Sequence, residues 1–254
     1  MKKFIPNALT LLNLFCGVIA IILAVQGELI FAAYFVFAGI FFDFFDGLAA
    51  RLLKVQSELG LQLDSLADVV TSGVVPGIVM YQLFNMSSGV YTWGHPESSE
   101  SIFGNGTLNI EFLSLFGLLI TLGSAYRLAK FNIDENQTDS FIGLPTPANA
   151  LLILSFPLIL EFQESAFLSG LILNKWFLII VTVVSTYMMN ARIELFALKF
   201  KTWGFKENSI RYVFLVISAL LIALLQYASI PVIIFLYVLF SIVVSYQKKS
   251  KPAV

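Results

Sequence analysis

Four carboxylates lie in a part of the sequence that is otherwise almost continuously hydrophobic. Asp43, Asp46, Asp64 and Asp68 are four of the six aspartates in the chain. A carboxylate at bilayer depth costs at least a few kcal/mol, so each is expected to face a cavity, a cation or a partner. Four such groups in one short region therefore predict bound metal.

The spacing of these aspartates places them in pairs. Asp43 and Asp46 are three residues apart, and Asp64 and Asp68 are four apart, so each pair shares one face of a helix. The intervening segment 51–58 is polar enough for a short aqueous turn. We therefore expect a helical hairpin that brings the two pairs together.

Like charges this close repel one another unless cations neutralise them. Oxygen-only ligands suit Mg2+ or Mn2+, and two such ions could share four carboxylates as a clamp across a reacting phosphate. Gly47 and Gly60 lack side chains where backbones or a ligand have to approach closely.

The composition excludes an ordinary soluble domain, because 58% of the 254 residues are hydrophobic, only 12% are charged, and the mean hydropathy is +0.88. Segments of roughly 17 to 25 apolar residues can cross a membrane as helices. The sequence predicts an all-α polytopic bundle of eight transmembrane helices, near 8–26, 29–51, 60–84, 108–130, 146–162, 166–189, 209–226 and 230–246. Pro147 and Pro157 leave the ends of the fifth helix uncertain by several residues.

The distribution of Lys and Arg supports this count, since cytoplasmic loops carry the positive charge. In an eight-helix arrangement every Lys and Arg except Lys175 falls on one side. Both termini and the aspartate hairpin are then cytoplasmic, whereas the loop 85–107 lies outside. We therefore expect a polar cavity that faces the cytoplasm.

Two other interpretations of the first residues are less favoured. Lys2 and Lys3 before an apolar run resemble the start of a secretory signal peptide, but no small-x-small cleavage pattern follows the run. Cys16 resembles a lipoprotein acylation site, but the residues before it are bulky. Cys16 is expected to be a buried apolar residue, and His95 a solvated loop residue. Neither supports nucleophilic catalysis, and nothing indicates a nucleic-acid partner.

The run D43-x2-D46-G47-x2-A50-R51-x8-G60-x3-D64-x3-D68 resembles the complete signature of the CDP-alcohol phosphatidyltransferases. That resemblance implies transfer of a phosphatidyl group from a CDP-linked lipid to the hydroxyl of a small alcohol, with release of CMP. It implies that Asp43, Asp46 and Asp64 ligate metal, and that Asp68 ligates metal and is the candidate general base.

The resemblance also implies a set of residues that contact the CDP-lipid, with small side chains for close approach and Arg51 for charge. Alternatives remain: Arg51 can be a positive-inside anchor, Asn7 can be a helix cap, and the polar face of the first helix can serve helix–helix hydrogen bonding. The candidates are Asn7, Thr10, Asn13, Gly47, Ala50, Arg51, Gly60 and Ser65.

Residues 125–132 and 141–150 resemble the bacterial phosphatidylserine synthase branch of this family, in which the acceptor is L-serine. Arg127 and Lys130 are candidate partners for the carboxylate of serine or for donor phosphates, or they serve topology alone. Lys130 stands where this branch is expected to have arginine. The Gly-Leu-Pro-Thr-Pro run at 143–147 is either a rigid turn or part of the same cavity.

We divide the chain into a catalytic six-helix core, 1–208, and two additional helices with a cytoplasmic tail, 209–254, in one domain. Lys199, Lys201 and Lys206 either attract anionic headgroups or only orient the chain. The family resemblance suggests a homodimer.

The predicted reaction is CDP-diacylglycerol plus L-serine to phosphatidylserine plus CMP, with Mg2+ or Mn2+ and no covalent intermediate. Alternatives are another acceptor, such as glycerol phosphate, inositol phosphate or a second phospholipid, and a cation channel or transporter. Transporter sites usually lie near the bilayer midplane, whereas these carboxylates cluster at one membrane surface.

Overall fold

A computed structural model describes residues 4–89, 111–133, 141–195 and 204–250 of the chain. His95, Lys199 and Lys201, on which the sequence made predictions, lie outside these ranges. The elements in chain order are α1 Phe4–Val25, α2 Leu29–Leu52, α3 Glu58–Asp68, the π-helix η1 Val69–Val74, α4 Val75–Ser87, α5 Phe112–Leu115, the 3-10 turn η4 Phe116–Leu118, α6 Leu119–Ile133, β1 Phe141–Ile142, α7 Thr146–Phe162, α8 Ala166–Ile172, α9 Lys175–Asn190, β2 Glu194–Leu195, α10 Phe205–Leu225, the 3-10 turn η5 Gln226–Ala228 and α11 Ser229–Ser250.

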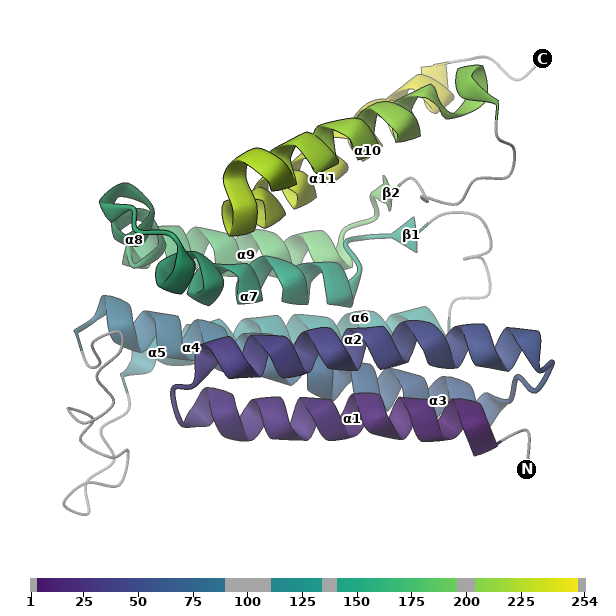
Figure 1. The fold of residues 1–254 in the computed structure, drawn as a ribbon, viewed down its shortest axis with the longest axis horizontal. Helices are drawn as coiled ribbons and strands as arrows, with labels where there is room; N and C mark the ends of the chain where they lie inside the picture. The colour runs from purple at the N-terminus through teal and green to yellow at the C-terminus, as the bar shows by residue number, and fades with distance from the viewer. Residues whose placement is uncertain (1–3, 90–110, 134–140, 196–203, 251–254) are drawn as a thin grey trace.

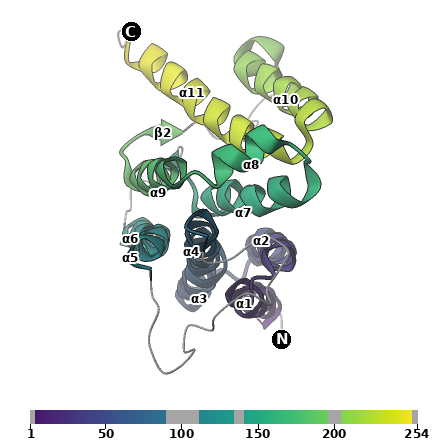
Figure 2. The same cartoon turned by 90° about the vertical axis from the view of Figure 1, so that its left-hand side faces the viewer.

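The helices form layers along a common direction (Figures 1 and 2). Helices α1, α2, α3–η1–α4 and α6 make the lower part, α7 and α9 lie over them, and α10 and α11 lie outermost. Helix α7 packs against α2, α4 and η1 on one side and against α11 and η5 on the other. It therefore joins the lower bundle to the last two helices.

Five helical stretches in the described part of the chain are long and apolar enough to cross a membrane, or six if the bent pair α8 and α9 counts as one. Helix α7 is apolar but shorter, with 17 residues. The chain is therefore an all-α integral membrane protein, as predicted. The five stretches count Asn208–Val244, which includes both α10 and α11, as one.

The expected continuous helix 166–189 is broken, because α8 and α9 meet at an angle of 62°. Asn174 lies in the break, and its side-chain oxygen accepts hydrogen bonds from the backbone N–H groups of Trp176 at 2.9 Å and Phe177 at 3.3 Å. An asparagine cap of this kind begins a new helix. Pro157, by contrast, lies inside α7 without breaking it.

A short antiparallel pair of strands connects two distant loops. Phe141 is opposite Leu195 and Ile142 is opposite Glu194. The pair holds the segment before α7 against the segment after α9, so the start of α7 is fixed on the bundle.

Three helices approach closely around Thr71 of η1. A Cβ atom at Gly39 of α2 would lie 2.7 Å from the Thr71 methyl and 2.8 Å from the Asn13 side-chain oxygen of α1. The Thr71 hydroxyl donates to the backbone carbonyl of Asn13 at 3.2 Å. Glycine at position 39 is therefore what allows α1, α2 and η1 to meet directly behind the acidic region.

Candidate functional site

Two helices supply the four aspartates at one end of the bundle. Asp43 and Asp46 lie near the end of α2, while Asp64 and Asp68 lie on α3. Carboxylate oxygens of Asp43, Asp46 and Asp64 all lie within 4.8 Å of one another. The helical hairpin expected from the sequence therefore brings three of the four carboxylates into one cluster.

The fourth carboxylate, Asp68, lies beside this cluster and outside the group of three. It is close enough to Asp43, Asp46 and Asp64 for electrostatic interaction. Its Oδ1 accepts a 3.4 Å hydrogen bond from Nδ2 of Asn13. Asp68 is therefore held from α1, at a position next to the three clustered carboxylates.

Helix α1 also holds Asp46. The Thr10 hydroxyl donates to Asp46 Oδ2 at 2.5 Å and lies 3.1 Å from the Pro6 carbonyl. Thr10 and Asp46 are both buried. Hydrogen bonds to a charged acceptor are among the stronger ones in proteins, so this contact fixes the carboxylate orientation.

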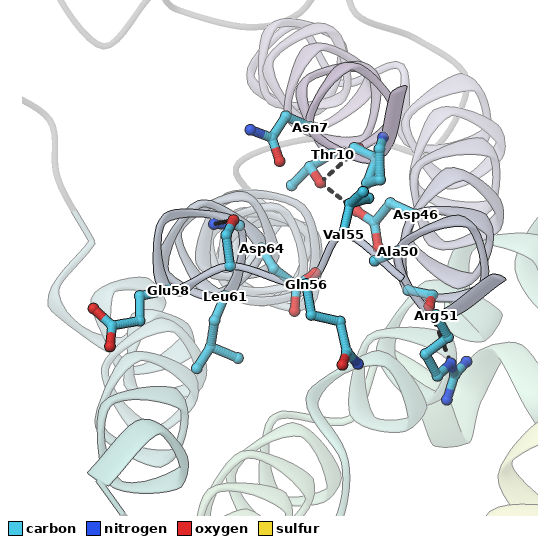
Figure 3. Close-up of a pocket in the computed structure, with 14 residues that line it drawn as sticks. Asn7, Thr10, Asp46, Ala50, Arg51, Val55, Gln56, Glu58, Leu61 and Asp64 are labelled. Atoms are coloured by element: carbon cyan, nitrogen blue, oxygen red, sulfur yellow. Dashed lines mark hydrogen bonds between the residues drawn. The ribbon is translucent and has the colours of Figure 1, made fainter. Parts of the chain in front are cut away.

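A cavity of about 570 Å³ opens next to the carboxylates (Figure 3), between α1, the end of α2 and the start of α3. Asp46 and Asp64 reach both the acidic cluster and the cavity. The residues that line it are Pro6, Asn7, Thr10, Asp46, Gly47, Ala50, Arg51, Val55, Gln56, Ser57, Glu58, Gly60, Leu61 and Asp64.

Six of the eight residues proposed for CDP-lipid contact line this cavity, and two do not. Asn13 lies deeper, against Asp68. Ser65 turns toward α6, where its hydroxyl donates to the side-chain oxygen of Asn132 at 2.9 Å. The Asn132 amide nitrogen lies 3.3 Å from the Gln62 side-chain oxygen, so these residues tie α3 to α6.

The two glycines of the cavity wall differ in their surroundings. A Cβ atom at Gly60 would lie 3.2 Å from the Ser57 hydroxyl and 3.5 Å from the Asn7 side-chain oxygen. At Gly47 the nearest atom would be an Arg51 nitrogen at 4.0 Å. Gly47 thus leaves open cavity space, and Gly60 allows α3 to approach α1.

Arg51 is exposed at the edge of the cavity. Its Nε donates to the Gly47 carbonyl at 3.0 Å, so the guanidinium lies along the end of α2 and away from Asp64 (Figure 3). A cation in the last turn of a helix is favoured by the helix dipole. The remaining guanidinium nitrogens are available at the opening of the cavity.

Arg127 and Lys130 of α6 line a second, small recess of about 20 Å³ together with Phe131, Ile142, Met189, Asn190 and Ala191. Arg127 is only 9% exposed and interacts electrostatically with Asp68. Arg127 therefore lies near Asp68, and it is not among the residues that line the large cavity.

Sequence reasoning did not predict the part of the cavity wall formed by Val55, Gln56 and Ser57. These residues belong to the turn between α2 and α3, which the sequence indicated only as polar. Asn132 was also missed, because its contact with Ser65 depends on how α6 packs on α3.

The clustered carboxylates fit a hard divalent cation. Ligand oxygens around an ion at about 2.1 Å can lie no more than about 4.2 Å apart. Three oxygens that share one ion lie closer still, at roughly 3.0–3.6 Å from one another. Oxygens that lie up to 4.8 Å apart would therefore move together by up to roughly an ångström to hold one ion. All three donors are carboxylate oxygens, which Mg2+ and Mn2+ prefer.

These features define a class: a helical membrane protein with several membrane-spanning helices, and with an acidic cluster suited to metal binding beside a large cavity. The sequence model of the family described as CDP-alcohol phosphatidyltransferase matches residues 3–188. The chain belongs to the CDP-alcohol phosphatidyltransferase family and is a transferase.

Curated relatives match part of this chain. The CDP-diacylglycerol–serine O-phosphatidyltransferase of Bacillus subtilis is 36% identical over 157 residues, which cover 61% of this chain and 76% of the relative. The enzymes of the same name from Helicobacter pylori and Methanocaldococcus jannaschii are 33% and 32% identical. The matches cover 59% and 60% of this chain, and 55% and 59% of those relatives.

Proposed function

We propose that this protein transfers the phosphatidyl group of CDP-diacylglycerol to the hydroxyl of L-serine, giving phosphatidylserine and CMP. The single observation that carries the proposal is the cluster of Asp43, Asp46 and Asp64, of which Asp46 and Asp64 line a large cavity. Family membership supports the phosphatidyl transfer, and the names of the relatives support serine as the acceptor.

Asp43, Asp46 and Asp64 would hold Mg2+ or Mn2+, with Asp68 beside them as a further ligand if two ions bind. A bound divalent cation neutralises pyrophosphate charge and stabilises the oxygens of an in-line displacement. The three carboxylates already lie together on two packed helices, and such preorganisation lowers the cost of binding.

The serine hydroxyl oxygen would attack the lipid-side phosphorus as the bond from that phosphorus to the CMP oxygen breaks. The hydroxyl proton would pass to Asp68, and CMP would leave with the bonding electron pair. Asp68 suits this role because it lies outside the cluster of three and is held by Asn13. No second nucleophile system lies among the described residues at the cavity wall, so direct transfer is favoured over a covalent intermediate.

The large cavity would take the CDP part of the donor. Gly47 and Ala50 leave room there, Asn7 and Gly60 form the opposite wall, and Arg51 offers charge to phosphate at the opening. Thr10 orients Asp46, and Asn13 and Ser65 support the site through Asp68 and α6. Arg127 and Lys130 would serve the acceptor or a phosphate.

The orientation with both termini and the cavity in the cytoplasm rests on the distribution of Lys and Arg. Counting α7, the α8–α9 pair, α10 and α11 as crossings gives eight. The family match ends at residue 188, which supports a catalytic core, 1–208, and an added pair of helices, 209–254. A homodimer is part of the proposal and can be measured by mass photometry in detergent.

The experiment measures CMP release from CDP-diacylglycerol by the purified protein with serine, glycerol phosphate or inositol phosphate, with and without EDTA. We expect release with serine, loss of release with EDTA, and recovery with excess Mg2+ or Mn2+. Release with glycerol phosphate alone would keep the reaction class and change the acceptor. Full turnover in EDTA would contradict the metal assignment.

A further inference from the structure

The first turn of α7 contains two buried polar side chains that lack hydrogen-bond partners. Thr146 and Asn149 are both fully buried. Neither the Thr146 hydroxyl nor either polar atom of the Asn149 amide has a partner among the described residues. The two residues are three apart in the helix, so they share one face.

Two further unpartnered groups lie on the elements around this turn. The Ser72 hydroxyl of η1 is fully buried and, within the described part of the chain, unbonded. Nε of Arg127 on α6 is likewise buried without a partner there. Helix α7 packs against both η1 and α6, and η1 packs against α6, so the three elements that carry these four side chains meet at one crossing.

Three contacts hold the elements around this crossing together. Gly73, next to Ser72, accepts a 3.0 Å hydrogen bond from the Thr121 hydroxyl of α6. The Ser124 hydroxyl contacts the Met189 sulfur at 3.5 Å. Leu144, two residues before α7, donates its N–H to the Met188 carbonyl at 2.9 Å.

The crossing also adjoins the acidic region. Ser72 follows Asp68 by one helical turn on the same continuous rod, and Arg127 interacts electrostatically with Asp68. Figure 1 shows α7 beginning over α2 and α6, toward the end of the bundle that carries α3. A molecule held at the crossing would therefore be next to Asp68.

An unbonded buried polar group costs about 1–3 kcal/mol, so a set of them at one crossing needs an explanation. Single buried polar atoms without a partner among the described residues also occur at Asn13, Gln163, Thr186, Asn190 and Ser218, but only in Asn149 do both polar atoms of an amide lack one, and other buried polar residues are fully bonded. Asn85 uses both polar atoms of its amide, with Gln82 and Ser114. The buried Thr182 hydroxyl donates to the Leu178 carbonyl at 2.8 Å.

We propose that Ser72, Arg127, Thr146 and Asn149 bind the amino and carboxylate groups of a free amino acid acceptor. The Asn149 side-chain oxygen accepts a hydrogen bond from the ammonium group, and its nitrogen donates to the carboxylate. Arg127 supplies the opposite charge for that carboxylate, and the two hydroxyls complete the contacts. This inference rests on the proposed function and specifies how its acceptor is recognised.

The four side chains offer both hydrogen-bond donors and hydrogen-bond acceptors, which suits an amino acid better than a phosphorylated substrate. A phosphate group offers acceptors only and is bound by clustered Arg, Lys and backbone N–H groups. Here one arginine stands with an amide that offers one donor and one acceptor, and two hydroxyls. That combination matches a zwitterion.

The test uses the full-length protein in detergent and measures initial rates of CMP release at varied serine and varied CDP-diacylglycerol. Asn149→Leu removes both hydrogen-bonding atoms at similar volume. We expect its KM for serine to rise at least tenfold, while its KM for CDP-diacylglycerol stays within twofold of the unaltered protein. Thr146→Val should raise the serine KM severalfold with the same selectivity.

Asn85→Leu and Thr182→Val are the matched controls, because they make the same changes at buried residues that already have partners. Each should leave the serine KM within twofold, whatever it does to the melting temperature. If Asn149→Leu does not fold, the KM for serine in Thr146→Val and Ser72→Ala tests the inference. Thr146→Val replaces a hydroxyl by a methyl group, and Ser72→Ala only removes a hydroxyl.

A second arm compares serine with ethanolamine, which lacks the carboxylate, and with glycerate, which lacks the ammonium group. We expect the preference of the unaltered protein for serine over glycerate to narrow at least fivefold in Asn149→Leu. The inference would be overturned if the KM for serine were unchanged in Asn149→Leu and Thr146→Val. It would also be overturned if the KM for serine and the KM for CDP-diacylglycerol rose equally. Absence of serine-dependent CMP release by the unaltered protein would instead overturn the proposed function.

Discussion

The helix α3–η1–α4 and the pair α10–α11 are both apolar, yet they are built for different surroundings. In an 18-residue stretch of Glu58–Ser87 the mean hydropathy is 1.4 and 56% of the stretch is buried within the protein. In an 18-residue stretch of Asn208–Val244 the mean hydropathy is 2.4 and only 11% of the stretch is buried. The more hydrophobic segment is therefore the less buried one. In a membrane protein, polar and small residues indicate protein contact, because lipid already accommodates the apolar ones.

The largest effect should come from removing a carboxylate of the cluster. In Asp64→Asn we expect activity to fall about 1000-fold, equivalent to roughly 4 kcal/mol, because a ligand oxygen loses its charge. CMP release and Mn2+ binding should both be lost. Glu28→Gln, an exposed acidic residue before α2, is the control and should be unaffected.

Asp68→Asn separates the two roles of the acidic residues. We expect turnover to be lost while Mn2+ binding at Asp43, Asp46 and Asp64 remains, because Asp68 lies outside that group. Robust CMP release by Asp68→Asn would remove Asp68 as the base.

The next effect concerns stability. Gly39→Val places methyl groups where Thr71 and the Asn13 oxygen already lie, and overpacking of this kind costs about 1–3 kcal/mol. The melting temperature in detergent should fall clearly. Gly170→Val is the matched control, since a Cβ atom there meets nothing within 4 Å; an equal fall in both variants would contradict the close packing around Thr71.

A smaller effect is expected from Thr10→Val, which keeps the shape of the side chain and removes the hydrogen bond to Asp46. Activity should fall about tenfold, or roughly 1.4 kcal/mol, and a higher Mg2+ concentration should partly restore it. The magnesium dependence of CMP release is the measurement. An unaltered magnesium profile would show that Thr10 does not orient Asp46.

The smallest effect should come from the outer helices. Leu224 on α10 is 69% exposed, so Leu224→Ala should change the free energy of unfolding by no more than about 0.5 kcal/mol. Leu83→Ala, at a fully buried residue of α4, should cost about 2–5 kcal/mol. Similar losses in the two variants would mean that α10 packs against protein that the single chain does not show.

Local patterns in the sequence predicted the helical hairpin and the meeting of Asp43, Asp46 and Asp64, because spacing within a helix fixes which side chains share a face. The sequence did not predict that Ser65 faces α6 or that Asn13 holds Asp68. Those contacts depend on the rotation of one helix against another. Glycines such as Gly39 permit that packing, but no single segment reveals which neighbour they meet.

The break between α8 and α9 illustrates the same limit. The segment 166–189 has the apolar length of one helix, and hydropathy carries no information about direction. Asn174 was the local signal for a new helix start. The pairing of 141–142 with 194–195 had no local signal, because two residues per strand are too few to form a pattern.

The π-helical turn η1 has a further consequence for the rod that begins at Glu58. A π turn contains more residues than an α turn, so everything beyond it is offset around the axis by about 100°. Asp64 and Asp68 can thus point at one neighbour while Gly77 contacts Thr121 of α6. The π turn therefore sets the angle between the face that carries the aspartates and the face that packs against α6.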